Sequence, residues 1–187
     1  MHIGITAPNG AGKDTVALFF KQKGLALYSL SDALRNICIE QNIPITRDNL
    51  IRLAESLKAQ QGHDVLAQKA LAYTKQPTVF VSIRHLAELQ TLKKHGVVII
   101  GIVADQKTRY ERNRIRNRYD DNYTYEEFLH QEQRERSGKQ AHHNNIDACM
   151  ALADIHIDNN GTLDALYAQL EHIIQHHKLL SIHFKNQ

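Results

Sequence analysis

The chain alternates between short, almost uninterrupted apolar runs and longer stretches in which apolar residues recur every three or four positions. The short runs predict buried strands, because strands covered on both faces lack polar alternation. They lie at residues 2–6, 25–30, 78–83, 97–103 and 154–158. The run at 97–103, with the sequence VVIIGIV, is the most apolar of these and predicts a central parallel strand.

Helical spacing of apolar residues fills the intervals between these runs. Helices are predicted from about residue 13, from residue 31, over 50–57, 65–73 and 86–94, through an arginine-rich stretch after 103, and over 124–136 and 163–174. Strands that alternate with helices predict an α/β fold, a three-layer α/β/α sandwich around a parallel sheet. We expect residues 1–187 to form one domain, with ligands bound at the carboxyl ends of the strands.

Composition narrows the class of protein but not its chemistry. The 187 residues are 42% hydrophobic and 23% charged, with a net charge of +3, which does not argue for a nucleic-acid partner. Cys38 and Cys149 have neither metal-site spacing nor a disulfide framework, which favours a reducing cytoplasm. No apolar stretch has the length of a signal peptide or a membrane span, so we expect a soluble, cytoplasmic protein. The sequence does not determine the oligomeric state.

A glycine-rich segment follows the first predicted strand and opens the first predicted helix. Residues 7–15, APNGAGKDT, match the phosphate-loop pattern G-x-x-x-x-G-K-[ST] at Gly12 and Lys13, with Ala7 at the first glycine position. Glycines let backbone N–H groups curl around an anion, and the helix start adds N–H groups and a positive dipole end. The segment predicts a nucleoside triphosphate site formed by Asn9, Gly10, Ala11, Gly12, Lys13, Asp14 and Thr15.

Asp14 departs from this pattern, because serine or threonine normally follows the lysine directly. A carboxylate at this position would repel phosphate unless Mg²⁺ lay between them. The sequence therefore predicts ATP and Mg²⁺ as cofactors, with Lys13 contacting the β- and γ-phosphates and Asp14 contacting the metal.

Several segments, taken in their order along the chain, resemble the adenylate kinase and dephospho-CoA kinase group of nucleotide kinases. The chain is most similar to an adenylate kinase-related branch known mainly from archaea, and its G-K-D-T sequence also resembles deoxynucleoside monophosphate kinases. The likeness covers most of the chain and rests on residues 7–15, 31–35 (SDALR), 82–84 (SIR), the arginines from 109, and Ala153-Asp154. The loop motif is specific for nucleoside triphosphates, whereas the other segments support the resemblance only through their order along the chain. The resemblance implies a P-loop NTPase fold with a helical lid.

The resemblance also implies residues for the acceptor and the metal. It places Asp32 near magnesium-bound water, Arg35 on the acceptor phosphate, and Thr15 beside Asp14 among the metal ligands. Asp32 can equally be a helix cap. Arg84, after the strand at 78–83, is a second candidate ligand of acceptor phosphate, or else a structural ion-pair partner.

Ser82 stands near the position where the related kinases carry a metal-binding aspartate, which leaves Asp14 and Asp32 as the carboxylates for magnesium. Residues 31–75 are expected to form the acceptor-binding helical region.

Five arginines fall within ten residues, at 109, 112, 114, 116 and 118. Arg109, Arg112 and Arg116 share one helical face, and Thr124 to Glu127 predicts a capping box for the next helix. Phosphoryl transfer needs charge neutralisation on a segment that closes over the substrates. We therefore predict a lid over 109–136 with Arg112 and Arg116 as catalytic groups, although one face can instead pair with acidic residues such as Glu132.

The sequence thus indicates an ATP-dependent kinase acting on a small phosphorylated acceptor, with a nucleoside or deoxynucleoside monophosphate favoured. Dephospho-CoA or another phosphorylated metabolite is an alternative acceptor. A nucleotide-binding regulator with weak catalysis is an alternative of another class, which Ser82 supports. Twelve histidines raise the question of a metal site, but no H-E-x-x-H pattern occurs.

Overall fold

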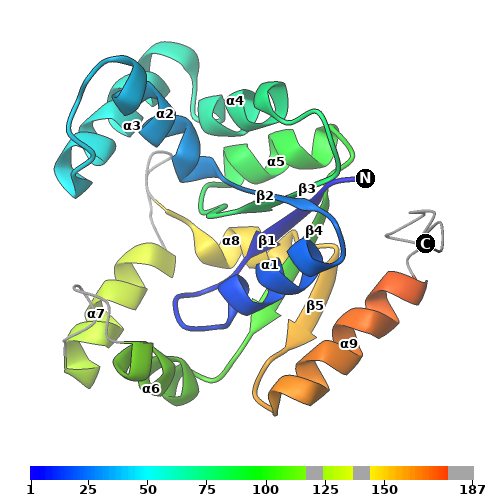
Figure 1. Cartoon of the computed structure of the whole chain (residues 1–187). Coiled ribbons are helices and arrows are strands. Elements are labelled where there is room, and N and C mark those ends of the chain that lie inside the picture. The colour runs from blue at the N-terminus through cyan, green and yellow to red at the C-terminus, as the bar shows by residue number, and fades with distance from the viewer. Residues whose placement is uncertain (117–123, 137–143, 177–187) are drawn as a thin grey trace.

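The structure is a computed structural model of the whole chain, and it describes residues 1–116, 124–136 and 144–176. The described residues form a five-stranded sheet in the order β2-β3-β1-β4-β5, and every pairing is parallel. The strands are β1 (Ile3–Thr6), β2 (Ala26–Ser29), β3 (Thr78–Val81), β4 (Val98–Val103) and β5 (Ile155–Asp158). Strand β1 is central, with β3 on one side and β4 on the other (Figure 1).

Helices cover both faces of this sheet. They are α1 (Lys13–Gln22), α2 (Leu30–Glu40), α3 (Arg47–Gln61), α4 (Val65–Tyr73), α5 (Leu86–Lys94), α6 (Gln106–Arg116), α7 (Tyr125–Arg136), α8 (Ile146–Ala151) and α9 (Leu163–His176). Helices α1 and α9 pack on one face, and α2, α4, α5 and α8 pack on the other. The predicted three-layer α/β/α sandwich is confirmed.

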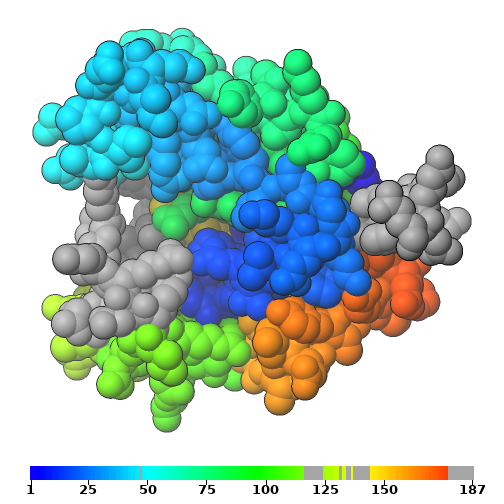
Figure 2. Space-filling view, viewed as in Figure 1, coloured from blue at the N-terminus to red at the C-terminus, as the bar shows by residue number. Residues whose placement is uncertain are grey.

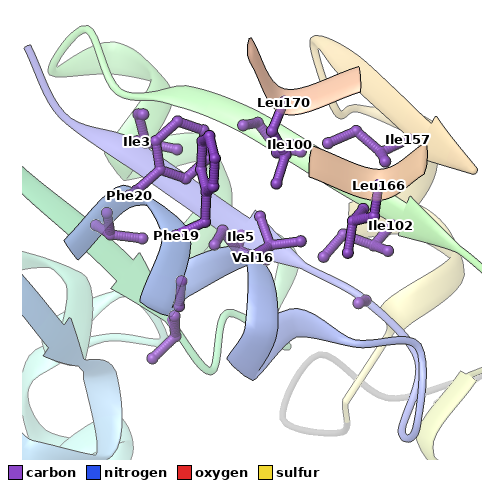
Figure 3. Close-up of a cluster of buried hydrophobic side chains, with 14 of the residues drawn as sticks. Ile3, Ile5, Val16, Phe19, Phe20, Ile100, Ile102, Ile157, Leu166 and Leu170 are labelled. Carbon is purple, nitrogen blue, oxygen red and sulfur yellow. The ribbon is translucent and has the colours of Figure 1, made fainter. Parts of the chain in front are cut away.

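The core follows the two-residue period of the strands. Ile3 and Ile5 face α1 and α9, where they pack with Phe20 and Leu170 (Figure 3). Gly4 lies on the opposite face, where an added Cβ would come within 2.6 Å of the Ile99 Cδ1 atom. Both faces of β1 are therefore closed by apolar packing, so its carboxyl end has a fixed position.

Because the strands are parallel, their carboxyl ends meet at one edge of the sheet. Helices α2 and α3 stand on one side of this edge, and α6 and α7 stand on the other (Figure 1). The surface is hollowed between them, and the dark blue N-terminal residues lie at the floor of the hollow (Figure 2). The predicted ligand segments therefore surround one space.

Most elements lie within a few residues of their predicted positions. The predicted capping box is confirmed: the Thr124 N–H donates to the Glu127 carboxylate (2.7 Å), and the Glu127 N–H donates to the Thr124 hydroxyl (3.3 Å). Helix α8 was missed, because six residues with two buried side chains, Ile146 and Cys149, show too little periodicity. No helix in the described part of the chain is long and apolar enough to cross a membrane.

Candidate functional site

The loop between β1 and α1 contains two glycines in the left-handed backbone region. Gly10 has a φ angle of 78° and Gly12 one of 99°. A Cβ on Gly10 would lie 2.4 Å from the Arg109 carbonyl oxygen, and one on Gly12 would lie 2.2 Å from the Asn159 side-chain nitrogen. Conformation and close packing therefore both require glycine at these positions.

Two distant residues hold this loop through its carbonyl groups. The Asn159 amide, just beyond β5, donates to the Ala11 carbonyl (2.8 Å), and the Arg109 Nη1 atom donates to the Asn9 carbonyl (3.3 Å). Helix α1 begins at Lys13, and Gly12 at its N-cap offers no side-chain acceptor to the first turn. The free N–H groups of a helix start are a general anion site. The loop therefore has the local form of a phosphate-binding loop.

Lys13, Asp14 and Thr15 begin the helix at this loop. The Lys13 side chain is 17% exposed, and its Nζ atom lies 3.9 Å from the more exposed Asp14 carboxylate. The half-buried Thr15 hydroxyl makes no hydrogen bond to another described residue. Carboxylate and hydroxyl oxygens suit Mg²⁺, which commonly completes its shell with phosphate and water oxygens. Within the described residues no three His, Cys, Asp or Glu side chains cluster as a metal site.

Asp32 occupies the first turn of α2 and belongs to its capping box. Its Oδ2 atom accepts the Ser29 N–H (3.0 Å), and its Oδ1 atom pairs with the Arg35 Nη1 atom at 2.6 Å. The cap interpretation of Asp32 therefore applies, and the shared helix face of Asp32 and Arg35 brings them together. A carboxylate has lone pairs beyond these two bonds, so the metal role of Asp32 stays a prediction.

The ends of β2 and β3 are joined by two serines. The Ser29 hydroxyl donates to the Ser82 hydroxyl (3.0 Å), and Ser82 has a φ angle of 66°, which is uncommon for a residue with a side chain. The half-buried Arg84 follows this turn, and its carbonyl accepts the N–H of Asn145 from the start of α8 (2.9 Å). Backbone strain of this kind concentrates at functional sites, where surrounding contacts hold it.

A buried charge cluster, formed by Lys58, His85 and Glu88, includes the residue that follows Arg84, and no sequence pattern predicts it. Glu88 is 1% exposed and caps α5 by accepting the His85 N–H (3.4 Å). The Lys58 Nζ atom, from α3, lies 3.7 Å from the Glu88 Oε1 atom and 2.5 Å from the His85 Nε2 atom. The spacing of His85 and Glu88 fits a helix cap, but nothing in the sequence connects either residue with Lys58.

Burial shifts both members of this pair toward their neutral forms. It raises the pKa of Glu88 from 4.5 to about 7, although Lys58 and the N–H groups of Arg84 and His85 act in the opposite direction. It also lowers the pKa of Lys58 despite the attraction of Glu88. Desolvation therefore outweighs the attraction between the two charges.

This shift gives a test of the buried pair by pH. A raised carboxyl pKa in the folded state stabilises the fold fully below 4.5, and that stability is lost as pH rises through about 7. The parent should lose about 3 kcal/mol of its free energy of unfolding between about pH 4 and about pH 8, and Glu88→Gln should not show this loss. Urea denaturation across this range measures it, with Glu171→Gln, from the half-buried Lys23–Glu171 pair, as a control. Equal pH slopes in the parent and Glu88→Gln would contradict the shift.

Arg109 lies inside the protein rather than at the surface of the predicted lid. It is 2% exposed, forms an ion pair with the buried Glu132 of α7, and donates through Nε to the Ala104 carbonyl (2.9 Å). Glu132 also accepts from the Gln106 amide (2.7 Å). Because Arg109 also donates to the Asn9 carbonyl, it links the phosphate loop, the end of β4 and α7.

Arg112 lies in a different environment from that of Arg109. Its Nη1 atom is buried and has no hydrogen-bond partner among the described residues. A buried donor without an acceptor costs about 1–3 kcal/mol, which a bound anion can offset. Arg114 is exposed and lies over the Tyr110 ring (5.9 Å from Cζ to the ring centroid). The backbone of Arg116 ends α6, while its side chain and Arg118 lie outside the described residues.

Comparison with known proteins gives the family. No protein-family model matches the chain. It is 30% identical over 182 residues to the UPF0200 protein PH1008 of Pyrococcus horikoshii, covering 92% of this chain and 94% of that protein. The chain belongs to the UPF0200 family. Another member, MJ1399 of Methanocaldococcus jannaschii, is 29% identical over 180 residues, covering 92% of this chain and 88% of that one.

Solved structures with a similar fold include named kinases. A shikimate kinase from Bacteroides thetaiotaomicron matches with a TM-score of 0.61 and 9% identity, over 95% of this chain and 98% of that one. A shikimate kinase from Acinetobacter baumannii, solved with shikimate, matches with a TM-score of 0.58 and 15% identity, over 96% and 95%. A gluconokinase from Sinorhizobium meliloti has a TM-score of 0.51 and 16% identity, over 96% and 97%. This UPF0200 chain therefore has a P-loop kinase-like fold.

Proposed function

We propose that this protein transfers the γ-phosphoryl group of ATP to a nucleoside or deoxynucleoside monophosphate. The observation that carries the proposal is the glycine loop between the central strand β1 and α1, which ends in Lys13. Arg35 and Arg84 follow β2 and β3 at the same sheet edge. The kinase-like fold and the resemblance to the adenylate kinase and dephospho-CoA kinase group support the same reaction class.

On the donor side, the loop residues 9–15 would bind the triphosphate, and Lys13 would neutralise the β- and γ-phosphates. Asp14, Thr15 and Asp32 would hold magnesium, which would supply positive charge against the phosphate oxygens. Arg112 and Arg116, from the lid at 109–136, would neutralise charge on the transferring group. The Arg112 Nη1 donor, which lacks a partner among the described residues, supports an anion at this place.

On the acceptor side, Arg84 and Arg35 would hold the acceptor's phosphate, and the helical region 31–75 would cover it. An oxygen of that phosphate attacks the γ-phosphorus, the bond from the γ-phosphorus to the β–γ bridging oxygen breaks, and ADP leaves. The protein's own contribution is to align the two phosphates and exclude water.

Replacing Arg84 with lysine should separate acceptor binding from ATP binding. A lysine keeps the charge but not the planar two-point contact with phosphate. We expect the KM of the acceptor to rise about tenfold or more, with little change in the KM of ATP. Steady-state kinetics with each substrate varied measures this, with Arg114→Lys as the control. A rise in the KM of ATP alone would contradict the assignment.

A screen for ADP formation tests the proposal as a whole. The panel should hold nucleoside and deoxynucleoside monophosphates, dephospho-CoA, and the shikimate and gluconate named for the structural neighbours. We expect ADP release with one or more monophosphates. Release with dephospho-CoA alone would favour the alternative acceptor, and ATP binding without transfer to any compound would favour a nucleotide-binding regulator.

A further inference from the structure

We propose that Lys58 is a positioning residue for the acceptor, because its buried contacts hold helix α3 against the strand end that carries Arg84. The inference rests on the proposed function, in which Arg84 binds acceptor phosphate and α3 belongs to the region that covers it. The contacts join two segments far apart in the sequence, since Lys58 lies on α3 and both His85 and Glu88 lie at the start of α5.

Helix α3 is otherwise weakly anchored. Of its fifteen residues only Leu57 is buried among the described side chains, while Leu50, Leu53 and Ala54 are partly buried. The Lys58 side chain, next to Leu57, is 10% exposed, and the Glu88 side chain is 2% exposed. The Lys58 contacts therefore join the C-terminal half of α3 to the body of the protein at a point shielded from solvent.

The same carboxylate also fixes the backbone that carries Arg84. Glu88 interacts with the N–H groups of Arg84 and His85. From the other side, Asn145 donates to the Arg84 carbonyl, and the Thr6 hydroxyl donates to the Ile83 carbonyl (3.2 Å). A shift of Glu88 would therefore move Arg84, and Lys58 transmits the position of α3 to that carboxylate.

Stability alone does not account for the Lys58–Glu88 pair. A buried pair can often be replaced by neutral groups of similar volume without loss of stability, whereas removing one partner is strongly destabilising. Double replacement therefore separates the two roles. A neutral pair preserves packing and stability, but it removes the ammonium contacts that tie α3 to Glu88 and His85.

The experiment compares Lys58→Met, the double variant Lys58→Met/Glu88→Gln, and Lys93→Met as a matched control. Lys93 is on α5 and pairs with Asp154 (2.6 Å), so its variant also loses a lysine ion pair, but one that does not reach α3 or Arg84. Three kinds of measurement are made on the full chain. They are urea denaturation, amide hydrogen exchange of α3 without ligand, and steady-state kinetics that give the KM of ATP and of the nucleoside monophosphate that the parent uses.

We expect the double variant to unfold at the same urea concentration as the parent, or a higher one. Its α3 amides should nevertheless exchange about tenfold faster than the parent's, with α5 unchanged, and the acceptor KM should rise about tenfold at constant ATP KM. Parent-like exchange in α3, or a parent-like acceptor KM in the double variant, would overturn the inference. A parent that phosphorylates no acceptor would overturn the proposed function instead, and the exchange measurement would still report whether Lys58 holds α3.

Discussion

Replacing Lys13 with alanine is expected to abolish phosphoryl transfer while leaving the fold intact. The lysine follows the N-cap of α1, at the end of a loop whose two glycines cannot accept side chains. Its charge would neutralise the β- and γ-phosphates as charge moves between them. Removal of such a preorganised cation should lower kcat by on the order of 10³-fold.

Lys21→Ala is the matched control for this variant. Lys21 is an exposed lysine in the last turn of the same helix, so both variants remove one lysine from α1. Far-UV circular dichroism should be the same for the parent and both variants, and only Lys13→Ala should lose turnover. Turnover by Lys13→Ala equal to that of Lys21→Ala would mean that the loop does not act on the triphosphate.

Replacing Arg112 with alanine is expected to lower kcat far more than it weakens ATP binding. The Arg112 Nη1 atom is a buried donor without a partner among the described residues, and an anion that arrives only with substrate would satisfy it. An arginine on the transferring group can contribute on the order of 10³-fold in rate. Both kcat and kcat/KM should then fall together, whereas a uniform binding contact changes mainly KM.

Arg114→Ala is the control, because Arg114 lies two residues away on α6 and is exposed. Arg116→Ala is expected to resemble Arg112→Ala. Amide exchange across 109–136 should slow when ATP and acceptor are both bound, as the segment closes. Near-normal kcat in the Arg112 and Arg116 variants, together with unchanged exchange, would identify the arginines as a solvated surface.

The sequence was most informative where one local segment determines its own conformation. The glycine loop between β1 and α1 could be predicted because Gly10 and Gly12 set the backbone conformation and Lys13 begins the helix, and these features depend on neighbouring residues. The parallel sheet could be predicted because apolar runs such as VVIIGIV leave few alternatives for a buried strand. The P-loop kinase-like fold of similar solved structures agrees with this parallel sheet.

Most contacts that hold the site together could not be predicted, because they join distant parts of the chain. The sequence allowed one face of the arginine stretch to pair with acidic residues such as Glu132, and the structure shows that Arg109 makes this pair. Asn159 reaches the phosphate loop across 148 positions of sequence. Lys58 and Glu88 each have an ordinary surface composition around them, so their burial becomes visible only when α3 and α5 meet.

The most direct test of the central claim is phosphorus NMR of the reaction mixture with ATP, magnesium and the monophosphate chosen by the ADP screen. Transfer predicts that the γ-phosphoryl signal of ATP is replaced, one for one, by a β-phosphoryl signal on the acceptor. With Lys13→Ala, the γ-phosphoryl signal of ATP should persist over the same time, and no β-phosphoryl signal should appear on the acceptor. Release of inorganic phosphate in equal amount with and without the acceptor would show hydrolysis instead, and it would contradict a kinase function for this protein.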